Sequence, residues 1–454
     1  MKNGLLFTFL ILSAVTFGQT FKIKYSEQLA VYVFLEHISE NYPDNNFKTE
    51  FQKSKYNIEK YNTIISKFEH LQLDYSYRFD EFPFGSKKAV QTMDLIKKNL
   101  IETDNLTDFK LRFIGLLPNT VLHDLVSCIS DFTPIYKELI YAPNKGKFEN
   151  QLLKITNYSR ENAIDDYFST GLVFYNSIWD NSIPFEIAFY PLPNSKGFTA
   201  EAFCNNFISA IQTDLISYKD LFSVMLHETY HIIYDEQSLE VKKAIDGYFK
   251  QNNSKCSNYA YQIMNEALAT ALGNGYVYEK LDGKLNSGSW YNKKYINLLA
   301  KQIYPLVKQY IEEKKPMDQY FIDQYISIYE ENFPDWINEL DHIMTYRYVI
   351  SENEKDFNTV KQLYRYRSRS EYETAITAST IEKMQQTSLT KVIIISDNNA
   401  EKIKLLKSKF TELKNWKASP NEEFVYKILL NDKSQLIVLN QKKSTIETLL
   451  KSVK

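Results

Sequence analysis

The chain of 454 residues is longer than one compact core usually grows, so two or three domains are expected. Hydrophobic residues make up 44% of it and charged residues 24%, a balance that excludes a disordered chain. A formal net charge of −2 excludes an overall basic field that would attract nucleic acid or anionic lipid, so no nucleic-acid partner is expected.

The first 20 residues, "MKNGLLFTFLILSAVTFGQT", have the layout of a secretory signal peptide. Lys2 precedes an apolar stretch from Leu5 to Phe17, and the small residue Gly18 follows it. The stretch is too short to span a bilayer, so no stable membrane insertion is expected. The alternative is a buried N-terminal helix. We expect residues 1–18 to be removed, and the mature protein to be secreted or periplasmic.

Residues 19–180 are expected to form a helical N-terminal region. Apolar residues recur at intervals of three and four in "YSEQLAVYVFLEHI" and "KYNTIISKFEHLQL", which is typical of amphipathic helices. Turn signals such as "NYPDNN" and "APNKGK" separate the segments.

Residues 181–385 begin with two expected strands and continue as helix. Apolar and other residues alternate in "IPFEIAFYPLP", which predicts a half-buried strand, and "GFTAEAFCNNFISAI" predicts a second. A long helical pattern then runs from Ser217 to Glu240. A second helix is expected over Ser257 to Leu272, where "GNG" should stop it. The basic run "LYRYRSRSEY" at 363–372 is interpreted as a solvated helix face.

Residues 390–454 read as strand, helix, strand, strand and helix, and so predict a small C-terminal α/β unit. It contains no histidine, cysteine or glycine-rich phosphate loop. The chain as a whole is therefore expected to be α+β and mostly helical. The three cysteines, Cys128, Cys204 and Cys256, allow one disulfide, but the sequence does not select the pair.

The stretch "LHETYHIIYDE" at 226–236 contains two of only six histidines in the chain. Residues four apart lie on one face of an α-helix, so His227 and His231 can share one Zn²⁺. Glu228 would border the metal without binding it, where a base for a metal-bound water must sit. The alternative is two ordinary helix histidines, but the flanking residues are apolar and unpaired polar groups among them would be costly.

A catalytic zinc site needs a third protein ligand and one open position. Asp235 shares the histidine face but lies about 12 Å along the axis from His227, too far to close on one ion. Glu266 lies in the apolar stretch "YAYQIMNEALATALGNG", where a buried carboxylate needs a partner and a metal supplies one. We therefore expect His227, His231 and Glu266 to bind one Zn²⁺ per chain.

The pair "HETYH" and "NEALATALG" resembles the gluzincin zinc metallopeptidases, in which thermolysin-like enzymes carry HExxH and a later helix with N-E-A. The resemblance covers roughly residues 180–280. It implies a zincin-like catalytic core, the three zinc ligands named above, Glu228 as general base, and an extended peptide bound along an edge strand ahead of the active-site helix.

Two features depart from that family. The 34 residues between His231 and Glu266 exceed the spacing of the thermolysin group. Thr270 stands where that group has an aspartate that supports a zinc-bound histidine. Support is then expected from another residue, such as Asp235 or Glu236.

The resulting hypothesis is an exported zinc-dependent metallopeptidase that hydrolyses peptide bonds of a peptide or protein substrate through a zinc-activated water, with Glu228 as general base. The alternatives are a non-catalytic binding or scaffold protein with a structural or degenerate zinc site, and zinc-dependent hydrolysis of a non-peptide substrate. The candidate donors to a developing oxyanion are five residues: Tyr259, Tyr261, His342, Tyr346 and Tyr348.

Overall fold

The structure, a computed structural model, describes residues 21–86, 89–193, 197–366 and 368–453. The expected signal peptide, residues 1–18, lies outside the described residues. The described residues form two compact units. The first unit comprises residues 21–73, 93–166 and 178–216, and the second comprises residues 74–92, 167–177 and 217–453. Helices and small sheets together make the chain α+β and mostly helical, as expected from the sequence.

The first unit consists of a bundle of helices and a four-stranded sheet. Its helices are α1 (Glu27–Ile38), α2 (Asn46–Gln52), α3 (Glu59–Glu69), α4 (Thr92–Glu102), α5 (Leu106–Phe113), α6 (Asn119–Tyr136), the π-helix η2 (Lys137–Tyr141) and α7 (Ala142–Glu161). Its strands are β1 (Phe21–Tyr25), β4 (Phe185–Pro191), β5 (Glu201–Phe203) and β6 (Asn206–Ile211). Helix α8 (Ile164–Tyr175) begins in the first unit and continues into the second.

The sheet of the first unit has the order β1-β4-β6-β5. Strand β4 pairs in parallel with β1 and β6, and all seven of its residues are buried, so the expectation of a half-buried strand was wrong. A central strand in a parallel sheet is covered on both faces, which explains this burial. The second expected strand is an antiparallel hairpin, β5 and β6, which turns at Cys204 in a left-handed conformation.

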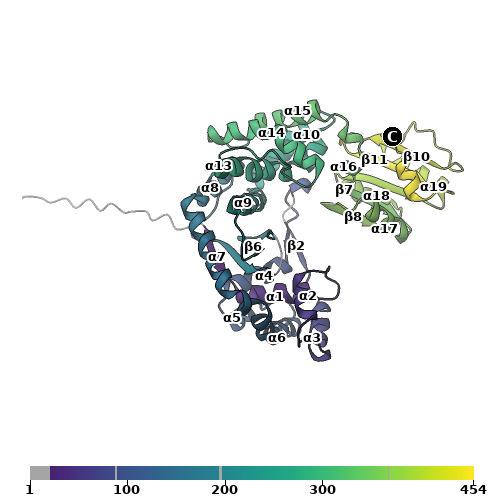
Figure 1. The fold of residues 1–454 in the computed structure, drawn as a ribbon. Helices are drawn as coiled ribbons and strands as arrows, with labels where there is room; N and C mark the ends of the chain where they lie inside the picture. Colours follow the sequence, from purple (N-terminus) through teal and green to yellow (C-terminus); the bar gives the residue numbers. More distant parts are fainter. Residues whose placement is uncertain (1–20, 87–88, 194–196, 367, 454) are drawn as a thin grey trace, which may run out of the picture. The chain divides into compact units, whose positions relative to one another are not determined.

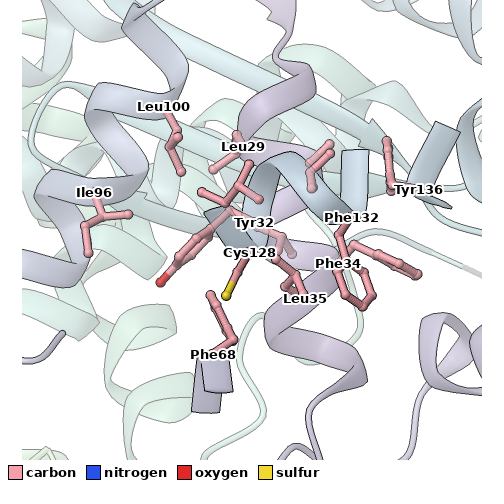
Figure 2. Packing of buried hydrophobic residues seen from close by; sticks show 14 of the residues in the cluster. Leu29, Tyr32, Phe34, Leu35, Phe68, Ile96, Leu100, Cys128, Phe132 and Tyr136 are labelled. Atoms are coloured by element: carbon pink, nitrogen blue, oxygen red, sulfur yellow. The ribbon is translucent and has the colours of Figure 1, made fainter. Parts of the chain in front are cut away.

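The core of the first unit is packed between α1, α3, α4 and α6 (Figure 2). Helix α1 begins where the side chain of Ser26 accepts a hydrogen bond from the backbone N–H of Leu29, an N-cap of the usual kind. Phe34 of α1 contacts Phe132 of α6 with ring centroids 6.5 Å apart, and both are fully buried. Aromatic rings in such contact contribute more than their buried area alone.

The second unit contains the remaining elements. Its helices are α9 (Tyr218–Asp235), α10 (Leu239–Gln251), α11 (Ser257–Gln262), α12 (Met264–Ala269), the π-helix η3 (Thr270–Val277), α13 (Tyr278–Asp282), α14 (Lys294–Glu312), α15 (Gln319–Asn332), α16 (Leu340–Ile343), α17 (Glu354–Leu363), α18 (Ala378–Gln385), α19 (Asn399–Lys409) and α20 (Ile446–Lys451). Short 3₁₀-helices are η1 (Phe84–Ser86), η4 (Trp336–Asn338) and η5 (Thr411–Leu413). Its strands are β2 (Ser76–Arg78), β3 (Ala89–Gln91), β7 (Tyr346–Ser351), β8 (Arg369–Glu373), β9 (Thr390–Ile395), β10 (Phe424–Leu429) and β11 (Gln435–Asn440).

The C-terminal strands, helices and order of elements follow the expected pattern, but they belong to a larger sheet. Its order is β10-β11-β9-β7-β8, so the strands after residue 390 extend a sheet that begins at β7 (Figure 1). The hydroxyl of Tyr259 links this sheet to α11. It lies 3.0 Å from Oγ1 of Thr390 and accepts a hydrogen bond of 2.9 Å from the backbone N–H of Gln435.

Two segments differ from their expected boundaries. The helical pattern from Ser217 to Glu240 is two helices, because Ser238 caps the start of α10 by accepting a hydrogen bond from the N–H of Val241. The basic run at 363–372 is not a helix face. It comprises the end of α17, a connecting loop and strand β8.

The three cysteines are free thiols, so the disulfide that the sequence allowed does not form. Among the described helices, none combines the length and apolar character that a membrane crossing requires.

Replacing Phe132 by alanine should lower the free energy of unfolding by about 3–5 kcal/mol, because it removes a buried aromatic ring. Leu111→Ala is the matched control, since this side chain of α5 is 65% exposed, and it should change the value by less than about 0.5 kcal/mol. Equilibrium urea denaturation measures both. Equal effects would contradict the core as described.

Candidate metal centre

Helix α9 brings two imidazoles together. His227 and His231 lie one turn apart on the same face, and their Nε2 atoms are 3.2 Å apart. Two nitrogens bound tetrahedrally to one ion at 2.0–2.1 Å would lie roughly 3.3 Å apart. The two side chains therefore have the spacing that a shared metal ion requires.

Glu266 of α12 completes a group of three. Its Oε2 atom lies 3.8 Å from Nε2 of His227 and 3.5 Å from Nε2 of His231. The three ligand atoms all lie within 4.8 Å of one another. Within the described part of the chain, this is the one group of three such side chains with metal-ligand spacing. The sequence-predicted metal residues thus converge in space.

The donor atoms are poorly satisfied by the protein itself. Oε2 of Glu266 is buried and has no hydrogen-bond partner among the described residues. A buried carboxylate oxygen without a partner is costly unless a cation or a donor is bound to it. The pair of imidazole nitrogens and this oxygen match the donor set of catalytic zinc sites, which combine two histidines with one glutamate.

In the metal-free protein, the protonation states of the three side chains depend on one another. Burial lowers the pKa of His227 to about 3, and the charge of His231 acts in the same direction. Burial would also lower the pKa of His231, but the hydrogen bond and negative charge of Glu266 outweigh it and raise that pKa to about 9. His231 in turn lowers the pKa of Glu266 to about 2 against the effect of burial. Near neutral pH the group therefore holds one proton, on His231 beside the Glu266 carboxylate.

Asn265 orients His231. The Nδ1 atom of His231 lies 3.0 Å from Oδ1 of Asn265, so Nδ1–H donates to the amide oxygen and Nε2 faces Glu266 and His227. The sequence suggested Asp235 or Glu236 for this role, which is wrong. Both are exposed, and Asp235 lies 3.9 Å from Lys242 instead.

Asn274 lies beside the other histidine. Burial lowers the pKa of His227, and the side chain of Asn274 opposes this to a small degree. Nδ1 of His227 and Oδ1 of Asn274 are both buried without a hydrogen-bond partner among the described residues. Thr270, where the sequence lacks an aspartate, is fully buried. The residue beside His227 is thus Asn274, four residues further along the chain than Thr270.

The π-helix η3 accounts for that shift. The helix was expected to stop at "GNG", but the backbone continues through these residues as a π-helix to Val277. A Cβ atom on Gly273 would lie 2.7 Å from the backbone N and Cα atoms of His227, so only glycine fits here. Ser223 also donates a 3.1 Å hydrogen bond to the carbonyl of Gly273. Wider helical turns of this kind occur often at functional sites.

Glu228 follows His227 on α9 and is half-buried. Its negative charge contributes to the raised pKa of His231, and it is not a member of the group of three. Its role as general base stays a prediction.

Three tyrosines surround Glu266. The ring of Tyr291 stacks on that of His227 with centroids 5.8 Å apart, and its hydroxyl helps to lower the pKa of Glu266 through a hydrogen bond. Tyr366 interacts with the hydroxyl of Tyr291, and burial and the charge of Glu266 raise the pKa of both tyrosines. The pKa of Tyr346 is raised by burial and, to a lesser degree, by the same charge.

The sequence identified only Tyr346 of these three. Tyr291 lies in the glycine- and serine-containing loop before α14, and Tyr366 lies in the basic run interpreted as a solvated surface. The tyrosines interleaved with the basic residues of that run were the sequence feature that could have indicated Tyr366. The other expected donors lie elsewhere: His342 is 2.7 Å from the hydroxyl of Tyr329, and Tyr348 donates to Glu373. Tyr259 binds the C-terminal sheet, and Tyr261 stacks on Phe249.

Comparison with known proteins finds no family model, no curated protein and no solved structure that matches this chain. The function must therefore be argued from the geometry of the site.

Gly273→Ala should separate α9 from η3 and weaken metal binding, because the added methyl group meets the backbone of His227. We expect a loss of stability of about 1–3 kcal/mol and at least a tenfold loss of Zn²⁺ affinity. Gly247→Ala is the control, since its Cβ atom in α10 would meet nothing closer than 3.9 Å. Thermal denaturation and metal titration measure both, and unchanged affinity in Gly273→Ala would contradict the close contact.

Binding of Zn²⁺ should release about one proton at about pH 6, because the ion displaces the proton of His231, whose pKa is raised to about 9. The apparent affinity should accordingly rise with pH and level off above about pH 9. Without metal, the ion pair stabilises the fold fully below the ordinary histidine pKa, about 6.5, and this stabilisation is lost as pH rises through about 9. Calorimetry in buffers of different ionisation enthalpy counts the protons. Zero release at this pH would refute the protonation state given above.

Proposed function

We propose that the protein is a zinc-dependent metallopeptidase with a gluzincin-like, zincin-type site. The observation that carries the proposal is the convergence of Glu266, from a separate helix, on the His227–His231 pair, with its Oε2 atom within 3.8 Å of both Nε2 atoms. His227, His231 and Glu266 would hold one Zn²⁺. The expected signal sequence at residues 1–18 supports an exported enzyme.

Bound zinc would supply Lewis-acid chemistry: it polarises a carbonyl group and lowers the pKa of water. The protein would supply the proton transfers. Glu228 influences the pKa of His231 but lies outside the ligand group, and its carboxylate would accept a proton from the attacking water. Glu228 would then pass this proton to the leaving amine.

Tyr291 is the best-placed donor to the oxygen of the scissile carbonyl. Its ring lies against His227, and burial together with the charge of Glu266 raises its pKa, so that the hydroxyl stays protonated at neutral pH. A protonated hydroxyl can donate a hydrogen bond as negative charge develops on the substrate oxygen. Tyr366, in contact with Tyr291, would orient this hydroxyl.

The number of ligands favours catalysis over a purely structural site. Structural zinc sites are usually closed by four protein ligands, whereas catalytic sites have three and keep one position open. The group described here has three members, and none of the three cysteines belongs to it. A scaffold protein would also have no use for a carboxylate at position 228.

Glu228→Gln should retain one Zn²⁺ per chain while peptide hydrolysis falls by a factor on the order of 10² to 10⁴, because the amide cannot accept a proton. Glu266→Ala should lose zinc and activity together. Glu236→Gln is the matched control, since this exposed glutamate lies beyond His231 on α9 and should change neither. Metal analysis combined with a peptide-library digest measures all three.

Two outcomes would contradict the proposal. Full zinc in Glu266→Ala would remove the third ligand, and with it the gluzincin-like site. Full activity in Glu228→Gln would show that another residue is the base.

A further inference from the structure

A cavity of about 490 Å³ lies in the second unit. Its walls come from the start of α14, from the segment between α17 and β8, and from the start of α16. They include Lys293, Tyr364 and Tyr366 and the two acids Glu339 and Asp341. The proposed function does not by itself assign a role to this cavity.

Tyr366 connects the cavity to the centre. Its side chain lines the cavity and also interacts with Tyr291, whose hydroxyl reaches Glu266. The loop that carries Tyr366 is held by the fully buried Arg347, which donates a 2.9 Å hydrogen bond to the carbonyl of Tyr364. A group bound in the cavity would therefore be separated from Glu266 by two tyrosine side chains, those of Tyr366 and Tyr291.

Two cations in the cavity, Lys293 and Arg365, form no ion pair among the described residues. Lys294 is paired with Glu339 at 2.9 Å, and Asp341 and Arg365 are both exposed to solvent. Nζ of Lys293 lies 4.2 Å from the centroid of the Tyr366 ring. Within the part of the chain that the structure describes, no carboxylate forms an ion pair with Lys293 or with Arg365.

The position of Lys293 is also unfavourable with respect to the dipole of helix α14. It is the N-cap residue of the 19-residue helix α14, and its side chain makes no capping hydrogen bond. A cation near a helix N-terminus opposes the helix dipole, so helix stability does not explain this lysine. Residues that oppose local helix stability in this way are expected where the side chain takes part in ligand binding.

We propose that this cavity binds a carboxylate group of the peptide substrate. The inference rests on the proposed function and specifies its substrate. Lys293 and Arg365 would pair with the carboxylate, and the rings of Tyr364 and Tyr366 would contact the attached carbon chain. The carboxylate belongs either to the C-terminus of the peptide or to an acidic side chain.

Binding to zinc-loaded Glu228→Gln protein tests the inference without turnover. The probe is one short acetylated peptide in four forms, with glutamine or glutamate as the last residue and with a free or amidated terminus. Forms with a carboxylate should bind about tenfold more tightly than the glutamine amide, as charge-assisted hydrogen bonds typically do. A gain from the free terminus alone would identify the peptide end as the source, and a gain from glutamate alone would identify the side chain.

The second substitution Lys293→Gln should remove most of this preference, and Arg365→Gln should reduce it. Lys301→Gln is the matched control, because Lys301 lies on the same helix and over an aromatic ring, that of Trp290 at 5.6 Å, but outside the cavity. Equal affinity for all four peptides, no binding of any form, or an unchanged preference in Lys293→Gln would overturn the inference.

Hydrolysis by the unaltered protein separates this inference from the proposed function. Hydrolysis without a carboxylate preference would contradict only the carboxylate site in the cavity. A carboxylate preference without hydrolysis would contradict the proposed function but not the carboxylate site.

Discussion

The close contact between the backbones of α9 and η3 determines the rest of the candidate centre. At Gly273 the absence of a side chain lets the second helix approach to where a methyl group would overlap His227. The helical run that contains Gly273 also contains Glu266 and Asn274, so this one contact sets the distance of both side chains from the histidines. The centre is therefore a property of a helix pair, and Figure 1 shows α9 within the helices of the second unit.

Electrostatics places a second constraint on the same helix pair. Oε2 of Glu266 lies within 3.8 Å of Nε2 of both His227 and His231, the hydroxyl of Tyr291 also acts on this carboxylate, and His227 is buried. In such surroundings a polar group that lacks its partner is costly, so the members stabilise one another only as a complete set. A small displacement of one helix would therefore change the distances between all of these groups. This explains why glycine, rather than any larger residue, occupies the contact position.

Local sequence features were enough to predict that His227, His231 and Glu266 lie together, that the chain is mostly helical, and the order of the C-terminal elements. The spacing of the histidines is a property of one helix, and Glu266 was identified because it is a charge in an apolar segment. Asn274 could not be predicted, since the insertion of a π-helix depends on packing against α9. Tyr291 and Tyr366 lie in loops whose positions are set by tertiary contacts. The burial of β4 likewise follows from its neighbours β1 and β6, which local alternation does not reveal.

The order of the five-stranded sheet has a consequence for when the protein is completed during synthesis. Strand β7, which begins with Tyr346, lies between β8 and β9, and β9 pairs in turn with β11. A chain that has been translated only to about residue 380 already contains every candidate ligand, yet β7 still has one open edge. Strand β7, which carries Tyr346, thus acquires its second neighbour only when β9 has been synthesised, so this sheet is completed late.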